Sequence, residues 1–245
     1  MAYRIDPDLS FLAQCSSEEL DPLVKYLTQD KDGALRYTEE LTMSAEYKAF
    51  APNHRRYWQL VAAELQLFGG NSFVSLFRGG EGVLYREVLT DVCDKMKVNY
   101  NKKATTEFIE SSLMAKILTD ALENMSEKER RELVQAIGVK TTSFTGPAVA
   151  AAIQIAIRTS GFMAYQIAAT VANIVARQLL GHGLTFAANA ALTRVIGILA
   201  GPIGWALTGL WTALTIAGPA YRVTIPSVIH VAFLRASLKH RGSGT

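Results

Sequence analysis

The chain has 245 residues, a charged fraction of 19% and a net charge of +3. The charged fraction is below the roughly 25% of ordinary globular proteins, and the mean hydropathy is +0.15. The length allows one large domain or two small ones with a substantial core. Two cysteines, Cys15 and Cys93, exclude a disulfide scaffold and indicate buried thiols in a reducing compartment.

The acidic residues are confined to the first part of the chain. All 22 of them lie at or before Glu132, so the first 132 residues carry a net charge of −5 and the rest carry +8. A soluble domain normally mixes both signs on its surface. This asymmetry predicts two parts, an acidic helical part over 1–140 and an apolar, basic helical part over 141–245.

The first part has the pattern of short amphipathic helices. Ser16 and Glu19 have the spacing of a capping box that opens a helix through Leu27. Apolar residues then recur at helical spacing over 54–70, 85–98, 105–125 and 126–139. No stretch alternates with period two, so the predicted fold class is all-α.

The second part consists of long uncharged runs separated by single arginines. The spacing predicts a helix over 147–180 that ends at Gly181-His182-Gly183, and a second over 184–200. A turn at Gly201-Pro202 then leads into a third helix over 203–217. The segment "YRVTIP" is expected to be extended, before a last amphipathic helix over 226–239 with a basic end.

The sequence lacks the common signatures of catalysis. It has no phosphate-binding loop, no H-E-x-x-H, no G-x-S-x-G and no C-x-x-C, and its four histidines lack metal-ligand spacing. We therefore predict no catalytic, cofactor or metal site. His182 fits best as a polar cap at a helix break, and a pH-sensitive group is the alternative. "NHRRYWQL" resembles a nucleic-acid surface, but the acidic first part would repel phosphates, so nucleic acid is excluded.

The segment "VIGILAGPIGWALTGLWTALTIAGPAY" carries the strongest functional signal. Small residues recur at four-residue spacing, which allows close helix packing in lipid, and its tryptophans suit a lipid–water interface. The two arms on either side of the turn have about 17 residues each, roughly 25 Å as helix. The residues assigned to this membrane hairpin are Gly197, Gly201, Pro202, Gly204, Trp205, Gly209, Trp211 and Ala213.

The absence of carboxylates from the second part also indicates contact with a membrane. Arginine and lysine can extend to lipid head groups and are attracted to anionic lipid, whereas carboxylates are repelled. The residues expected at lipid head groups are Arg158, Arg177, Arg194 and Arg222. The alternative is a buried helical hairpin in a soluble core, which hydropathy does not distinguish from a membrane segment.

Several blocks resemble a known family. "HRRYWQLVAAELQLFGG", "LYREVLTDV", "LGHGL" and "AYRVTIPSV" are similar to blocks of the uncharacterised bacterial YaaW family, and "DPDLSFLAQCSSEEL" is similar to its N-terminal segment. The resemblance covers nearly the whole chain. It implies a bacterial protein of one architectural unit and supplies no catalytic residues.

The leading hypothesis is a non-enzymatic, membrane-active protein with a soluble stored form. Its hairpin would insert into an anionic bilayer, and oligomerisation through the glycine faces would open a pore, as in helical toxins. The alternative is an adaptor or chaperone that binds a membrane-protein client through its apolar face, and a third option is an enzyme with a scattered site. No secretion signal is recognised at the start. We expect a cytoplasmic protein that associates with membranes when active and that has an inhibitory or client partner.

Overall fold

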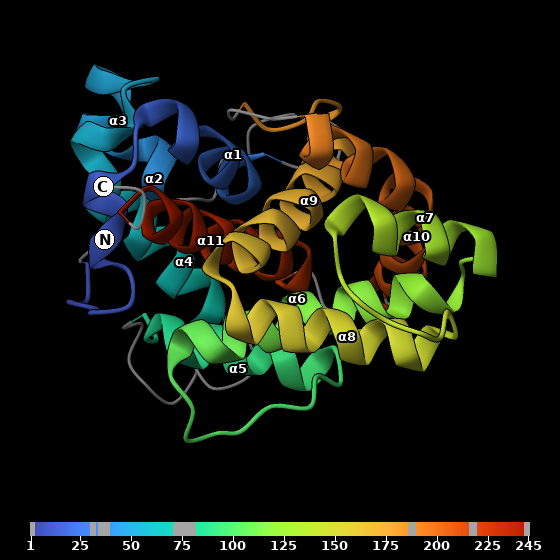
Figure 1. Ribbon diagram of the computed structural model, residues 1–245. Helices are drawn as coiled ribbons and strands as arrows, with labels where there is room; N and C mark the ends of the chain where they lie inside the picture. The colour runs from blue at the N-terminus through green and yellow to red at the C-terminus, as the bar shows by residue number, and fades with distance from the viewer. Residues whose placement is uncertain are drawn as a thin grey trace.

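The protein is all-α over the residues described by the computed structural model, which are 3–29, 33, 40–70, 82–185, 190–215 and 220–242 (Figure 1). For Gly70, Ala191 and 207–215 the description covers the backbone alone. The elements in chain order are η1 (Ser10–Gln14), α1 (Ser17–Thr28), α2 (Glu40–Met43), α3 (Ala45–Phe50), η2 (His54–Tyr57), α4 (Trp58–Gly70), α5 (Tyr85–Lys95), α6 (Thr106–Glu123), α7 (Glu127–Ile137), α8 (Gly146–Thr159), α9 (Gly161–Leu180), α10 (Ala190–Thr215) and α11 (Tyr221–Gly242).

Local capping starts the helices of the first part. The side chain of Ser16 accepts a hydrogen bond from the backbone N–H of Glu19, and the Glu19 carboxylate accepts one from the Ser16 N–H in return. Ser126 and Glu129 form the same arrangement at the start of α7. The predicted capping box at Ser16 is therefore confirmed. It stabilises the start of the helix, because each N–H that it satisfies would otherwise lack a partner in the first turn.

The helix predicted over 147–180 is two helices. α8 ends at Thr159 and α9 begins at Gly161, with a bend of 119° between them. Ser160 lies between them in an extended conformation, and its hydroxyl accepts a hydrogen bond from the N–H of Met163. Threonine, serine and glycine in succession are weak helix formers, and serine is a strong N-cap, so the break occurs here.

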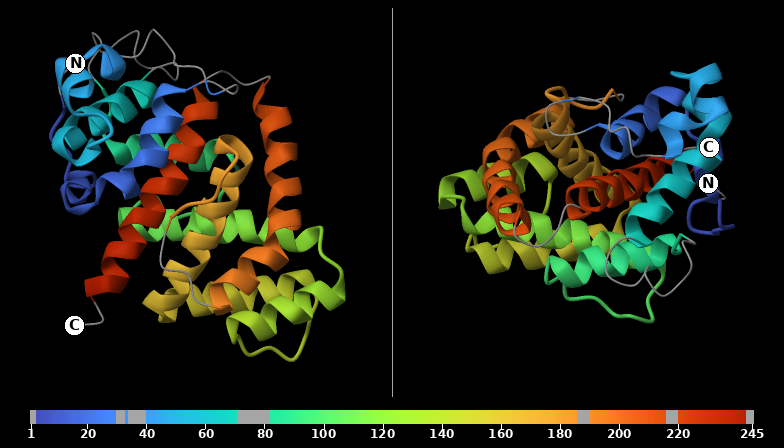
Figure 2. Two further views of the ribbon diagram at one scale, coloured as in Figure 1. Left: turned by 90° about the horizontal axis from the view of Figure 1, so that it is seen from above. Right: turned by 180° about the vertical axis from the view of Figure 1, so that it is seen from behind.

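The predicted turn at Gly201-Pro202 is wrong. α10 runs as one curved helix through Pro202, so the two arms of the expected hairpin are a single element (Figure 2). Proline removes one hydrogen bond and bends a helix without forcing it to reverse. Leu199 and Ile203, which lie on either side of Pro202, are both fully buried, and α10 packs against α6, α7 and α9, so packing supports the helix through the proline.

The centre of the molecule is α11. Its residues from Val223 to Leu234 are all buried, and it packs against α9, α1, α4, α5 and α6 (Figure 1). The predicted extended segment at its start is wrong, since the helix begins at Tyr221 and includes Pro226. The central buried helix is therefore α11, which has a basic C-terminal end, and not α10, which contains the most apolar stretch of the sequence.

One hydrophobic cluster connects the two parts of the chain. It extends from Leu9 to Leu234 and takes in residues of every long helix. The two predicted buried thiols, Cys15 and Cys93, are buried in it, as expected. The division at Lys140 stays a prediction, and helices from both sides of it share this core.

Candidate functional site

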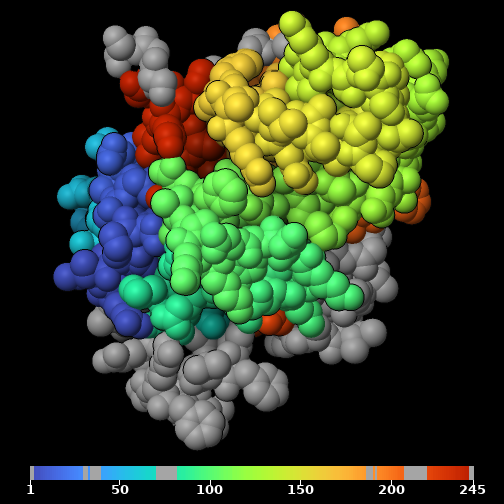
Figure 3. Space-filling view, turned by 60° about the horizontal axis from the view of Figure 1, so that its bottom comes forward, coloured from blue at the N-terminus to red at the C-terminus, as the bar shows by residue number. Residues whose placement is uncertain are grey.

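A groove lies where α6, the α8–α9 bend and the end of α11 meet, on the face shown in Figure 3. It has a volume of about 540 Å³. Apolar side chains make up much of its wall, among them Met114, Ile157 and Ile167. Phe108 and Phe162 also line it, and they are 37% and 44% exposed. Large apolar side chains that stay in water beside a concave surface are typical of a binding site.

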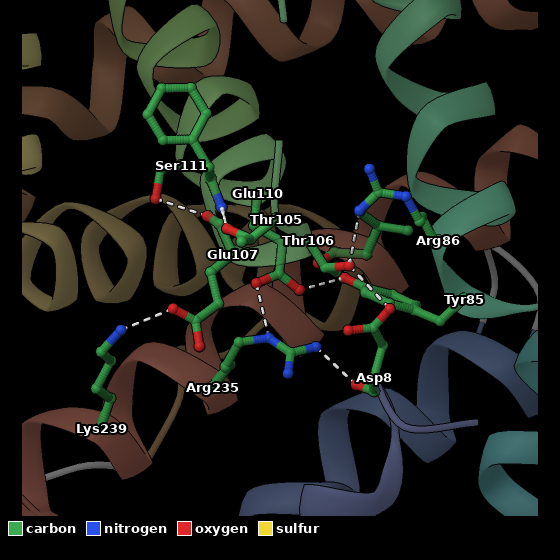
Figure 4. A network of polar contacts seen from close by, with 12 residues as sticks. Asp8, Tyr85, Arg86, Thr105, Thr106, Glu107, Glu110, Ser111, Arg235 and Lys239 are labelled. Atoms are coloured by element: carbon green, nitrogen blue, oxygen red, sulfur yellow. Dashed lines mark hydrogen bonds and ion pairs between the residues drawn. The ribbon is translucent and has the colours of Figure 1, made fainter. Parts of the chain in front are cut away.

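A buried ion pair lies at the base of this groove. The Nε of Arg235 is 2.8 Å from Oε2 of Glu110, and the two side chains are 15% and 5% exposed. Tyr85 donates its hydroxyl to Oε1 of Glu110 at 2.7 Å, and Nη2 of Arg235 donates to the backbone carbonyl of Asp8 at 2.6 Å. Figure 4 shows these residues coming from α6, α11, α5 and the N-terminal segment. Elements far apart in the sequence therefore fix the positions of the Arg235 and Glu110 side chains at the base of the groove.

Further contacts fix the network from the sides. The hydroxyl of Thr106 donates to Oδ2 of Asp8 at 2.8 Å, and Arg86 donates to the Thr106 oxygen at 3.2 Å (Figure 4). At the rim, Lys239 forms an exposed ion pair with Glu107 at 2.7 Å. The base is thus satisfied and rigid, and the rim is polar.

Burial raises the pKa of Glu110, and Arg235 opposes this rise. Burial, together with the Glu110 charge, also places the pKa of Tyr85 well above its usual 10. Tyr85 is therefore a hydrogen-bond donor at neutral pH. The charges of the pair compensate each other inside the protein, which suits a fixed polar anchor under an apolar surface.

The two carboxylates of the groove, Glu107 and Glu110, are each held by a cation. Within the described ranges, no group of three histidine, cysteine, aspartate or glutamate side chains could hold a metal ion.

The four predicted head-group arginines are exposed. Arg158 lies at the groove, with its guanidinium 5.3 Å from the centre of the Phe108 ring. Arg177 is in the last turn of α9, Arg194 on α10 and Arg222 in the first turn of α11. They belong to different elements, and their contact with lipid stays a prediction.

The predicted hairpin residues share one helix, α10. A Cβ added at Gly197 or Gly201 would meet nothing within 4 Å, and Trp205 is 74% exposed. Gly204 faces α9, where its carbonyl accepts a hydrogen bond from Gln178 at 3.0 Å. At Gly209, Trp211 and Ala213 the structure describes the backbone alone. Among the residues that the structure describes, no atom of another helix therefore packs against Gly197 or Gly201, the two glycines at four-residue spacing.

The missing carboxylates of the second part have a structural counterpart. Three basic residues of α11 pair with carboxylates of the first part. These pairs are Arg235–Glu110, Lys239–Glu107 and Arg241–Glu19. The hydroxyl of Tyr221 lies likewise 3.2 Å from Asp91. The charge asymmetry therefore reflects, in part, ion pairs within the chain.

None of the predicted site residues lies at the base of the groove. Glu110 lies among the apolar positions of α6, next to Ile109 and one turn before Met114. Arg235 directly follows twelve buried residues of α11. Each of these two residues is a charge on an otherwise apolar helix face. Buried charges are normally paired, so the two charges of opposite sign could have indicated an ion pair.

Comparison with known proteins defines the class. A family model described as ubiquinol-cytochrome C chaperone matches residues 53–230, and a domain of unknown function matches residues 3–37. The chain belongs to the family of this chaperone model, and it also belongs to the UPF0174 proteins, which include YaaW. A UPF0174 protein of Helicobacter pylori (strain J99) is 49% identical over 236 residues, which are 96% of this chain and 93% of the relative. YaaW of Escherichia coli (strain K12) is 34% identical over 238 residues, 95% of each chain. No solved structure matches the chain.

The predicted membership of the YaaW family is confirmed, and the predicted pore-forming toxin is wrong. The family match is to a chaperone. In the part of the chain that the structure describes, no single helix is both long and apolar enough to cross a bilayer. α8 and α9 reach that length and composition only as a pair, across their 119° bend.

Proposed function

We propose that this protein is a non-enzymatic, chaperone-like protein that holds an apolar segment of a membrane-protein client in the groove between α6, the α8–α9 bend and α11. The observation that carries the proposal is the exposure of Phe108 and Phe162 at this groove. Their rings stay partly exposed to water in the isolated chain, and covering the exposed part with an apolar partner is favourable. The family description, which names a chaperone, supports a client-binding role.

The size and charge of the groove support a short apolar occupant. About 540 Å³ lies within the ~300–1,000 Å³ of sites that enclose small ligands, and it accommodates a few side chains of a segment. The charges at its base are compensated by the Arg235–Glu110 pair. Lys239 at the rim is paired with Glu107, so Arg158 gives the rim a net positive charge, which favours a segment with an acidic flank.

The test is binding of a fluorescent peptide of about 20 residues, composed of leucine and alanine and flanked by aspartates. The intact protein should raise its fluorescence anisotropy. Phe108→Asp and Phe162→Asp should each weaken binding by about tenfold or more, because each removes an apolar contact and adds a charge that binding would bury. Both side chains are partly exposed, so the variants should fold normally.

Trp205→Asp is the matched control. Trp205 is a large exposed apolar residue on α10, outside the groove, and its replacement should leave binding unchanged. If Trp205→Asp abolishes binding while both groove variants bind normally, α10 is the client surface and the proposal for the groove fails. A wild-type protein that does not bind the peptide would contradict the client-binding role itself.

A further inference from the structure

A second cavity lies between α1, α9, the start of α10 and α11. Its volume is about 370 Å³. Phe162 and His240 line both this cavity and the groove. The remaining wall includes Tyr165 and Gln166 of α9 and Phe233 of α11. The cavity is thus adjacent to the groove, and most of its lining residues are different.

Two buried polar side chains of this cavity have unused hydrogen-bonding capacity. Gln166 is 2% exposed, and its side-chain amide makes no hydrogen bond to any described residue. His230 is 1% exposed, and its Nε2 lies 2.8 Å from the carbonyl oxygen of Glu19. A carbonyl only accepts, so Nε2 carries the proton and Nδ1 is a bare acceptor, for which the described part of the chain provides no partner. Buried polar groups are nearly always paired, so these two require an explanation.

Aromatic rings form one wall of the cavity. The ring of Tyr165 is stacked 4.8 Å from His240 with an angle of 18° between the planes, and 6.4 Å from Phe233 with an angle of 29°. These three rings make this wall of the cavity apolar, and an aromatic ring packs favourably against such a wall. Arg241 and Glu19, which also line the cavity, neutralise each other at 2.8 Å. The third charged residue of the wall, Glu18, makes the cavity unfavourable for an anion, and the aromatic wall favours an uncharged molecule that carries a ring.

We propose that this cavity binds a small, uncharged aromatic molecule that carries an O–H or N–H group. The ring of the molecule packs against Tyr165 and Phe233, and its polar group exchanges hydrogen bonds with the amide of Gln166. The volume lies in the ~300–1,000 Å³ range of small-molecule sites, which are mainly apolar with a few placed polar groups.

The test uses phenol as the probe and toluene as its matched partner without a hydroxyl, both titrated into the full-length protein and followed by saturation-transfer NMR. Phenol should bind more tightly than toluene. Gln166→Leu should weaken phenol binding by about tenfold and leave toluene binding unchanged or stronger, because the variant removes the hydrogen bond and keeps the volume. Gln154→Leu, on the exposed side of α8, should change neither.

Three results would overturn the proposal. These are no binding of phenol, equal binding of phenol and toluene by the wild type, and unchanged phenol binding by Gln166→Leu. Gln166→Met serves as a second variant if the leucine variant does not fold. A thermal melt provides a further readout, since replacing an unpaired buried amide by an apolar side chain of similar size should not lower the midpoint.

Discussion

Arg235 and Glu110 are 125 positions apart in the sequence, and their side chains form a 2.8 Å ion pair inside the protein. Arg235 belongs to the acid-free part of the chain and Glu110 to the acidic part. The pair therefore joins α11 to α6 directly beneath the groove.

Breaking this pair on one side should be strongly destabilising. Arg235→Leu leaves the buried carboxylate of Glu110 without its cation, which we expect to lower the free energy of unfolding by about 3–5 kcal/mol. The double variant Glu110→Leu/Arg235→Leu should recover most of this loss, because no uncompensated charge remains. Urea denaturation of the two single variants and the double variant measures the coupling. Additive effects would show that the pair contributes no interaction energy.

The buried His230 should make stability depend on pH. Burial lowers the pKa of His230 from 6.5 to about 4. The unfolded chain then binds more protons than the folded protein between these values, so stability falls as the pH drops from 6.5 towards 4, by about 3 kcal/mol in total. The raised pKa of Glu110 has the opposite effect above pH 4.5, where it makes stability rise as the pH falls. The hydrogen bond to His54 lowers the pKa of Asp21 to about 2, so Asp21 affects the pH dependence only below pH 3.8.

His230→Gln separates this contribution from the others, because it keeps a donor for the Glu19 carbonyl and does not titrate. The difference in unfolding free energy between the wild type and the variant should shift in favour of the variant as the pH falls from 6.5 to 4. A difference that is constant over this range would show that His230 is not held neutral.

Two glycines should respond to alanine in opposite directions. Gly197 lies within α10 with open space around its Cα, so Gly197→Ala should raise the free energy of unfolding by about 0.5–1 kcal/mol. A Cβ at Gly183 would lie 2.5 Å from Oδ1 of Asn173, which accepts the N–H of Leu184. Gly183→Ala should therefore be destabilising.

Thermal melts compare the two variants, and light scattering reports their mass. A loss of both stability and mass in Gly197→Ala would mean that this face of α10 packs against a second copy, as predicted from the glycine spacing.

The fragment 1–140 tests the predicted boundary. It retains the caps of α1 and α7 but lacks α11, which contributes buried side chains and the cations for Glu110, Glu107 and Glu19. We expect the fragment to show reduced helical circular dichroism and no sharp thermal transition. A transition as cooperative as that of the whole chain would establish 1–140 as an independent folding unit.

The sequence by itself determined the fold class, the capping of individual helices and the family. These features depend on neighbours within a few residues, such as Ser16 with Glu19, or on similarity along the chain. Only the tertiary structure decided that α10 continues through Pro202, that α11 is the central helix, and that Arg235 meets Glu110. Hydropathy measures how strongly a segment avoids water, and both a bilayer and a protein core satisfy that tendency. Which of the two surrounds a segment, and which carboxylate meets an arginine 125 residues away, depends on how the helices pack together.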